Sequence, residues 1–473
     1  MSLTKKIAYN TLIQYIGKVV TTILGILVVA LMTRYLGKDG FGQYITVTAF
    51  LAFFGIIVDF GLSLTATRTL GKPGIDADKY MSNMMTIRLL SSFIFMGLAP
   101  LVVWFFPYAI EVKWGVLIVT WSFFFISVNN ILASVFQKEL KMFIYTLAEV
   151  AGRIILLSGI AIAMYFKLGI YNIFLMITLG SFTHMIISFV AATRYVKFRV
   201  RFNWDVWKEI LKKSWPIAIS ISCNLLYLKT DTIILSLVRP EADVGLYGAA
   251  YRVVDILTML PSLFMGLVLP IFTTYWIQKN HFKLRSLVQM AFDAMIVIAL
   301  PIVLGTLVIG EKIMTLIAGQ EFIISGDILK ILIFAVGAIF IGTLFGYSVV
   351  GINKQKKMIW GYLSVAIVTL IGYIILIPIY GYWAAAILTL VSEALIAIIT
   401  AIIVTRTIKF FPSLKVFSKA LLAAVIMGGV LYLLQDLNVI LLLVIAIIIY
   451  FVLLILFKAV KKETIRELMS LKS

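Results

Sequence analysis

Long hydrophobic stretches, separated by short polar segments, follow one another along almost the whole chain of 473 residues. A helix needs about 20 apolar residues to cross the hydrocarbon core of a bilayer, and about fourteen stretches are long enough. Their apolar runs are continuous, whereas the strands of a membrane β-barrel alternate apolar and polar residues. The pattern therefore predicts an all-α polytopic membrane protein with about 14 transmembrane helices.

The predicted spans are distributed evenly along the chain and are joined by short polar loops. They cover roughly 11–33, 41–65, 82–106, 114–136, 146–166, 170–193, 214–238, 245–275, 287–309, 327–350, 358–377, 381–404, 416–434 and 438–457. The eighth is overlong and contains Pro261 and Pro270. Because proline removes a backbone donor, we expect this stretch to bend.

Basic residues are concentrated in alternate loops. One set of loops and the two ends hold Lys5, Lys6, Arg68, Lys72, Lys79, Lys138, Lys141, Arg194, Lys197, Arg199, Arg201, Lys279, Lys283, Arg285, Lys354, Lys356, Lys357, Arg406 and Lys458. The other set holds little beyond Arg34, Lys38, Lys113, Lys167, Arg239 and Lys312. By the positive-inside rule the first set is cytoplasmic, which places both termini in the cytoplasm.

Composition agrees with a chain that works inside the bilayer. Hydrophobic residues make up 62% and charged residues 13%, with a mean hydropathy of +1.09. The net charge of +20 is spread over short loops, so it indicates orientation and contact with anionic lipids rather than a nucleic-acid surface. The single cysteine, Cys223, lies in a span and excludes an intrachain disulfide.

The longest polar stretch, about 194–213, divides the chain after the sixth span. Its apolar residues Trp204, Trp207, Ile210 and Leu211 recur at helical spacing beside lysines, which predicts an amphipathic helix in the cytoplasmic interface. The predicted domains follow from this linker. They are a six-helix lobe at 1–195, a linker helix at 196–213, a second six-helix lobe at 214–410, and two further helices with a basic tail at 411–473.

A weak internal repeat supports two equivalent halves. Phe41-Gly42-Gln43-Tyr44 opens the second span, and Val244-Gly245-Leu246-Tyr247 opens the eighth, 203 positions later. Each follows an outer loop that carries an arginine and an aspartate. The repeat favours a duplication in which both halves have the same membrane orientation.

Two groups of residues resemble a known family. The segment MTRYLGKDGFGQY (32–44) with Asp59-Phe60-Gly61-Leu62 resembles the N-terminal signature of polysaccharide repeat-unit flippases. These are the Wzx-type branch of the multidrug/oligosaccharidyl-lipid/polysaccharide exporter superfamily. Lys229-Thr230-Asp231-Thr232, followed by 243–252 (DVGLYGAAYR), resembles the second-half counterpart, so the similarity extends over essentially the whole chain.

The resemblance implies a function in polysaccharide export, of O-antigen, lipopolysaccharide, capsule or exopolysaccharide. Two lobes enclose a central cationic cavity and move undecaprenyl-diphosphate-linked repeat units from the inner to the outer leaflet. The membrane is then the plasma membrane of a bacterium or archaeon. The implied partners are the lipid-linked oligosaccharide, membrane lipids and a polysaccharide polymerase complex. No cofactor is implied, and coupling to an H⁺ or Na⁺ gradient is open.

Charged residues inside the spans are the candidate site, because an ionisable group within the bilayer is costly without water, a partner or a substrate. The candidate cations that hold the diphosphate are Arg153, Arg252, Arg88, Lys18 and Lys229. The candidate coupling acids or partners are Glu393, Asp231, Asp59, Glu149 and Asp255. Glu393, near mid-span, is the best single coupling acid.

Structural explanations stand beside these assignments. Lys18 and Arg88 are close enough to the cytoplasmic face to snorkel. Glu149 with Arg153, and Arg252 with Asp255, are spaced so that each pair can neutralise itself on one helix face. Asp59 can cap a helix or form an ion pair near the interface, and His184 can be a packing residue. Glu393 can be a buried, neutral side chain with no role in coupling.

Other functions remain as alternatives. A peptidoglycan lipid-precursor flippase or a multidrug or cation antiporter of the same superfamily shares the hydropathy pattern. A membrane glycan polymerase is the enzyme alternative. The outer loops are short and hold no paired catalytic carboxylates, metal-ligand cluster or phosphate-binding loop, so no enzyme and no metal site are predicted.

Overall fold

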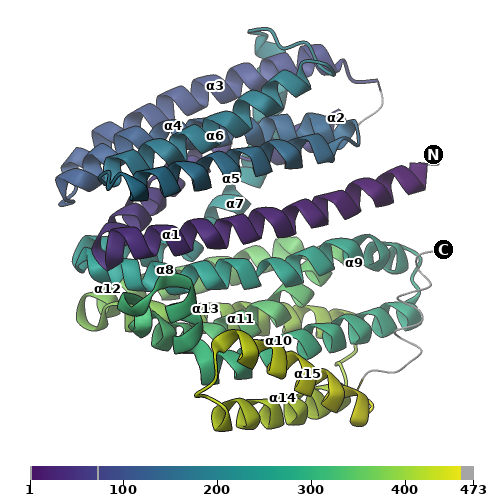
Figure 1. Cartoon of the computed structure of the whole chain (residues 1–473). Helices are drawn as coiled ribbons and strands as arrows, with labels where there is room; N and C mark the ends of the chain where they lie inside the picture. The colour runs from purple at the N-terminus through teal and green to yellow at the C-terminus, as the bar shows by residue number, and fades with distance from the viewer. Residues whose placement is uncertain (1–2, 72–73, 460–473) are drawn as a thin grey trace. The chain divides into compact units, whose positions relative to one another are not determined.

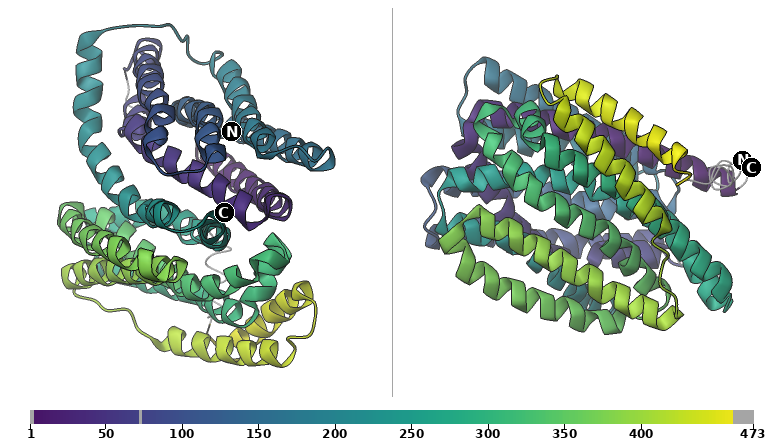
Figure 2. Two further views of the ribbon diagram at one scale, coloured as in Figure 1. Left: turned by 90° about the vertical axis from the view of Figure 1, so that its left-hand side faces the viewer. Right: turned by 90° about the horizontal axis from the view of Figure 1, so that it is seen from below.

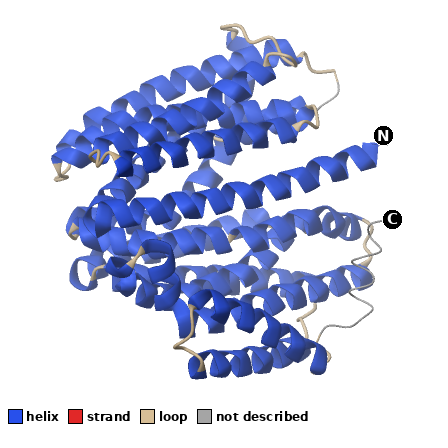
Figure 3. Cartoon of the chain, viewed as in Figure 1, coloured by secondary structure: helices blue, strands red, loops and turns tan. Residues whose placement is uncertain are grey.

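A computed structural model describes residues 3–71 and 74–459; within them, the side chains of 3–12, 15, 216–217 and 219–229 are outside the description. All regular structure in these ranges is helical, and they contain no strand (Figure 3). The all-α fold class is therefore confirmed. The chain divides into two compact units, Met1–Gly245 and Leu246–Ser473, which are taken in turn below.

The first unit is built from long helices that lie side by side (Figure 1). They are α1 (Leu3–Asp59), α2 (Leu62–Leu70), α3 (Ala77–Val102), the 3-10 turn η1 (Val103–Phe105), α4 (Ile110–Lys138), α5 (Met142–Tyr165), α6 (Ile170–Ala192) and α7 (Trp204–Val238). Helix α8 (Glu241–Leu257) begins in this unit and continues into the second.

The second unit continues with α9 (Met259–Ile277), α10 (His281–Ala318), the 3-10 turn η2 (Gln320–Phe322), α11 (Ile323–Gly351), α12 (Gln355–Tyr380), α13 (Tyr382–Ile408), α14 (Lys415–Leu433) and α15 (Val439–Leu456). Helices α14 and α15 pack on α10, as the views in Figure 2 show. The hydroxyl of Tyr450 on α15 donates to the carbonyl of Val297 on α10 at 2.9 Å. These two helices are the predicted C-terminal pair.

Twelve helical stretches in the described part of the chain are long and apolar enough to cross a membrane. One of them, Ile16–Asp59, covers most of the first two predicted spans, because α1 continues through a bend at Gly37. Gly37 has φ 63° and ψ −174°, a conformation that glycine adopts without steric cost. The predicted span 214–238 lies in α7, whose side chains are described only in part. The polytopic architecture is confirmed.

The overlong predicted span at 245–275 is interrupted, as expected from its prolines. Helix α8 ends at Leu257 and α9 begins at Met259. Pro261 lacks the N–H that would pair with the carbonyl of Leu257 four residues earlier, so the helix breaks at this point. Pro270, in contrast, lies inside α9.

The predicted amphipathic helix at 196–213 is wrong in its first half. Residues 197–203 are extended, and helix begins only at Trp204, from where it runs without interruption into α7. Trp207 and Ile210 are buried in the core of the first unit with Met81, Leu132 and other residues of α3 and α4. The spacing of these apolar residues correctly predicted a helix from Trp204 onward, but its apolar residues Trp207 and Ile210 pack against α3 and α4. The boundaries of the four predicted domains otherwise stay a prediction.

Candidate functional site

The Asp59-Phe60-Gly61-Leu62 segment makes a corner between α1 and α2. Phe60 and Gly61 both have positive φ, 40° and 71°, which ends α1 at Asp59 and lets α2 begin at Leu62. The Asp59 carboxylate accepts from Nη2 of Arg88 on α3 at 2.7 Å, and also from the Ser63 hydroxyl. The corner thus places a carboxylate opposite a cation within the span of α3.

Arg88 is fully enclosed by this corner. Its side chain is 0% exposed, Nη1 donates to the Val58 carbonyl at 3.1 Å, and Nη2 also donates to Ser63 Oγ at 2.8 Å. Nε has no hydrogen-bond partner among the described atoms. A diphosphate headgroup cannot reach Arg88 in this conformation. The structure therefore brings two predicted site residues, Arg88 and Asp59, together as a structural pair.

Glu149 and Arg153 occupy neighbouring turns of α5, and both are half-buried. The ion pair that their spacing allows does not form: among the described side chains neither has a hydrogen bond or an ion pair. The ring of His184 on α6 packs edge-on against Tyr145 on α5, with centroids 4.9 Å apart. Gly152 and Gly180 allow α5 and α6 to approach closely here, which supports a packing role for His184.

Lys18 lies on α1 where that helix packs against α5. A Cβ at Gly17 would overlap the Thr146 side chain, so the two helices are in direct contact at this level. Arg153 is seven residues after Thr146, about two helical turns farther along α5. Lys18 is half-buried and, within the described part of the chain, its ammonium has no ion pair. The α1–α5 pair thus presents two cations without a protein counter-ion, Lys18 and Arg153.

The signature around 229–232 is only partly visible. The side chain of Lys229 lies outside the described residues. Asp231 is 1% exposed, and its Oδ1 accepts from the backbone N–H of Thr232 at 2.6 Å and from the Thr232 hydroxyl at 3.1 Å. Asp231 is thus held within α7 by its neighbour.

In the second unit, Arg252 and Asp255 form the pair expected from their spacing. Nη1 of Arg252 is 3.7 Å from Oδ2 of Asp255, and both side chains are about one third exposed. Glu393 on α13 is 6% exposed and lies one turn from Thr389, whose hydroxyl is 3.2 Å from that of Tyr247. Burial of Glu393 was expected from its position near mid-span.

Helix α1 crosses the start of α8 within the first unit, and the two helices contact each other at Gly42 and Gly245. This contact was not predicted from the sequence. A Cβ at Gly42 would overlap the carbonyl of Glu241, and a Cβ at Gly245 would overlap that of Lys38. The Gln43 amide also donates to the Glu241 carboxylate at 2.7 Å. The glycines belong to the two sequence repeats, and each packs against the residue four before the other. The 203-residue shift was therefore the available signal for this contact.

Lys330 is a second residue that sequence reasoning missed. It lies on α11 and pairs with Asp327 at 2.8 Å and with Glu311 on α10. All three side chains are partly exposed. Glu311 and Asp327 are thus both paired with one lysine. The described residues hold no group of three or more potential metal ligands of the His, Cys, Asp or Glu type.

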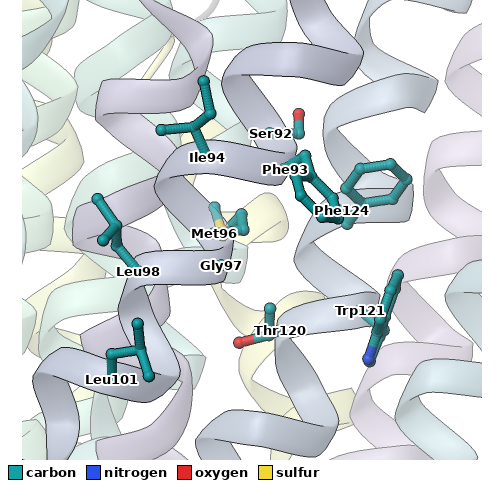
Figure 4. Close-up of a pocket in the computed structure, with 10 residues that line it drawn as sticks. All are labelled: Ser92, Phe93, Ile94, Met96, Gly97, Leu98, Leu101, Thr120, Trp121 and Phe124. Carbon is teal, nitrogen blue, oxygen red and sulfur yellow. The ribbon is translucent and has the colours of Figure 1, made fainter.

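A pocket of about 390 Å³ lies between α3 and α4 (Figure 4). Its lining is apolar apart from two hydroxyls; it consists of Ser92, Phe93, Ile94, Met96, Gly97, Leu98, Leu101, Thr120, Trp121 and Phe124. Both helices are membrane spans. With no charged lining residue, this pocket suits a hydrocarbon chain and not a diphosphate, so the charged positions remain the candidate headgroup site.

Comparison with protein families supports the resemblance seen in the sequence. A model of the polysaccharide biosynthesis protein family matches residues 3–276, which is more than half of the chain. The chain belongs to this family. Among its relatives, a protein of Shigella dysenteriae named as an O-antigen transporter is 22% identical over 413 residues, which cover 82% of this chain and 98% of that protein. A Haloferax volcanii protein named as a low-salt glycan biosynthesis flippase, Agl15, is 20% identical over 439 residues, covering 90% of this chain and 89% of the relative.

Solved structures show the same fold. The lipid II flippase MurJ in an inward closed conformation has a TM-score of 0.77 at 18% identity, covering 94% of this chain and 98% of MurJ. An inward-facing MATE family multidrug transporter of the MOP superfamily has a TM-score of 0.69 at 15% identity, covering 82% and 94%. This member of the polysaccharide biosynthesis family therefore has the fold of MOP-superfamily transporters.

Proposed function

We propose that the chain is a flippase that moves undecaprenyl-diphosphate-linked polysaccharide repeat units from the inner to the outer leaflet of a bacterial or archaeal plasma membrane. The observation that carries the proposal is a pair of membrane cations, Arg153 and Lys18, that have no counter-ion among the described side chains. A lone cation costs about 2.5–3.5 kcal/mol at the centre of a membrane helix on insertion scales. An anionic headgroup that visits these residues explains why the chain retains them.

The relatives support the class of cargo. One is named as an O-antigen transporter and one as a glycan flippase. A diphosphate-linked oligosaccharide is strongly polar and cannot cross bare hydrocarbon, so it requires a wet path with positive charge. Arginine binds phosphate through a bidentate fork and lysine through a point charge, which fits Arg153 and Lys18 as successive contacts.

The mechanism in this proposal is alternating access around the cationic cavity that the family resemblance implies. Arg252 contributes from the second unit, where Asp255 shares its charge. Glu393 is the coupling acid, which takes up a proton or holds Na⁺ as the gradient drives the cycle. Lys229 and Asp231 complete the proposed site, whereas Arg88 and Asp59 support its structure, and Glu149, one turn from Arg153, is a further coupling acid in this proposal.

Loss of surface glycan in a complementation assay tests the proposal. The chain is expressed in a host that lacks its own repeat-unit flippase, and surface glycan and membrane protein level are measured together. We expect rescue by the wild type, and loss of rescue by Arg153→Ala and Lys18→Ala at normal protein level. The control is Trp104→Ala, an exposed position in the 3-10 turn η1 after α3, which should rescue. Full rescue by both cation variants would overturn the assignment.

A lipid II flippase is the second candidate, favoured by the TM-score of 0.77 to MurJ over 94% of the chain. The two candidates differ in which host they rescue. The proposed function predicts that the chain restores surface polysaccharide but not growth of cells depleted of their lipid II flippase. Rescue of growth in the second host alone would decide for lipid II.

A further inference from the structure

The extended segment 197–203, here called the strap, is held along α3 by an alternating set of hydrogen bonds. Backbone N–H groups of every second strap residue donate to polar side chains of α3: Lys197 to Asp78 Oδ1 at 3.0 Å, Arg199 to Ser82 Oγ at 3.1 Å, Arg201 to Thr86 Oγ1 at 3.2 Å and Asn203 to Asn83 Oδ1 at 3.0 Å. The Ser82 hydroxyl donates in return to the Lys197 carbonyl at 3.1 Å. These bonds fix an otherwise unsupported loop in one conformation.

Both ends of the strap are anchored in the first unit. At its start, the preceding Val196 is 2% exposed in the core, and the ring of Phe198 stacks on Phe189 of α6. At its end, Asn203 Oδ1 caps α7 by accepting from the N–H of Val206, and Trp207 Nε1 donates to Asn83 Oδ1 at 3.1 Å. Asn83 therefore holds the strap and α7 with one carboxamide oxygen.

The strap turns basic and aromatic side chains outward. Val200 is 85% exposed, Phe202 70% and Trp204 59%, and the neighbouring arginines, Arg199 and Arg201, are also exposed. The Phe202 and Trp204 rings stack at 6.4 Å. Such a mixture of cations and large apolar groups is costly in water alone and is typical of segments at a membrane surface.

The position of the strap identifies its partner. It joins the end of one membrane span, Ile170–Ala192, to the beginning of α7 and lies against the first turns of another, Ala77–Phe105. Three further exposed cations, Arg194, Lys208 and Lys212, flank it, and the acidic Glu209 is already paired with Lys213. Asp205 is the other exposed acid in this part of the chain, so the surplus charge of the strap and its flanks is positive, next to the ends of two candidate membrane spans.

We propose that the strap is a preformed docking surface for the phosphate groups of anionic membrane lipids. Arg199 and Arg201 bind the phosphates, Phe202 and Trp204 enter the interfacial layer, and the α3 side chains hold the strap in the conformation that presents them. The surface is independent of the cargo and of the transport cycle. It anchors α3, α6 and α7 to one leaflet.

The test measures the affinity of the purified full-length protein for phosphatidylglycerol by microscale thermophoresis in detergent. Phosphatidylcholine is the zwitterionic comparison. Each basic residue near an anionic surface contributes a factor of about five. The double variant Arg199→Gln/Arg201→Gln should therefore bind phosphatidylglycerol roughly thirty-fold more weakly. The matched control is Lys356→Gln/Lys357→Gln, two exposed cations at the start of α12 that lie outside the strap; a lipid site located at the strap predicts less than about a three-fold change for them, whereas general attraction to any exposed cation predicts equal losses.

A third variant separates the shape of the strap from its charge. Ser82→Ala/Thr86→Val removes two acceptors of the strap and leaves every cation in place. We expect a several-fold loss of phosphatidylglycerol affinity with unchanged helix content and monodispersity. The proposal is overturned if the strap variant and the α12 control lose affinity equally, or if phosphatidylcholine binds as tightly as phosphatidylglycerol.

Discussion

Two arginines within the membrane spans of the first unit have opposite surroundings. Arg88 on α3 is fully buried, with three hydrogen bonds and an ion pair to Asp59 at 2.7 Å. Arg153 on α5 is half-buried and, in the described part of the chain, has no counter-ion, although Glu149 is one turn away. The residue type and the depth are similar. The comparison shows that the available partners, and not the presence of charge, separate a structural cation from a candidate binding cation.

The difference has an energetic basis. A buried cation that has lost its partner costs several kcal/mol, so Arg88 and Asp59 must be kept or removed together. Arg153 has no protein partner to leave uncompensated. Its energetic cost is balanced by water or by an anion that arrives from outside, which is what a carrier of a diphosphate requires.

The largest expected loss of stability follows from removal of the structural arginine, Arg88. Arg88→Ala leaves the Asp59 carboxylate without its ion partner, which should cost about 3–5 kcal/mol of unfolding free energy. Thermal unfolding of the detergent-solubilised protein and its level in membranes measure this. Arg88→Ala/Asp59→Ala should recover part of the loss, and equal instability of the single and double variants would contradict the pairing account.

A substitution at the contact between α1 and α8 should have an intermediate effect on stability, and it changes packing without changing charge. Gly42→Val places a side chain against the Glu241 carbonyl, and overpacking of this kind costs about 1–3 kcal/mol. We expect a lowered unfolding temperature and reduced surface glycan. Gly429→Val on α14, where a Cβ meets no atom within 4 Å, is the matched control. An equal loss in both variants would argue against a close crossing.

Lys330 is an ion-paired cation that is partly exposed, so its removal should cost less stability than removal of the buried Arg88. Lys330→Gln removes the partner of Glu311 and Asp327, but all three side chains are solvent-accessible, so we expect at most about 1 kcal/mol. The unfolding temperature should rise or fall only slightly, and the effect should shrink further at high salt. A loss as large as that of Arg88→Ala would mean that burial does not distinguish the two sites.

The smallest expected effect on stability is at Arg153. Because no protein partner is lost, Arg153→Gln should leave the unfolding free energy unchanged within about 0.5 kcal/mol. The same thermal unfolding experiment measures it, beside Arg88→Gln. A destabilisation of several kcal/mol would reveal that Arg153 is structural, like Arg88.

The sequence was sufficient for features that depend on local pattern. Continuous apolar runs predicted the spans, and Pro261 predicted the break between α8 and α9. The spacing of Arg252 and Asp255 predicted their ion pair, since both lie on one helix face. In each case the determining residues are close together in the chain.

Features that depend on contacts between helices could not be predicted in this way. The Arg88–Asp59 pair joins residues 29 positions apart, and its formation depends on the corner at Gly61. The strap was predicted as helix because apolar residues after Trp204 have helical spacing, but Asp78, Ser82, Asn83 and Thr86 on α3 offer acceptors to an extended backbone instead. For Arg153, local spacing allowed a pair with Glu149 as an alternative to a cavity cation, and this pair is not formed among the described side chains.

The most direct test of the central claim is the flipping rate of an undecaprenyl-diphosphate-linked oligosaccharide in proteoliposomes that contain wild type or Arg153→Gln protein. Loss of a charge-assisted hydrogen bond of about 1.5–3 kcal/mol predicts a rate lower by roughly ten-fold to a hundred-fold, with partial recovery in Arg153→Lys. An unchanged rate for Arg153→Gln, in protein as stable as the wild type, would contradict the assignment of Arg153 to the cargo.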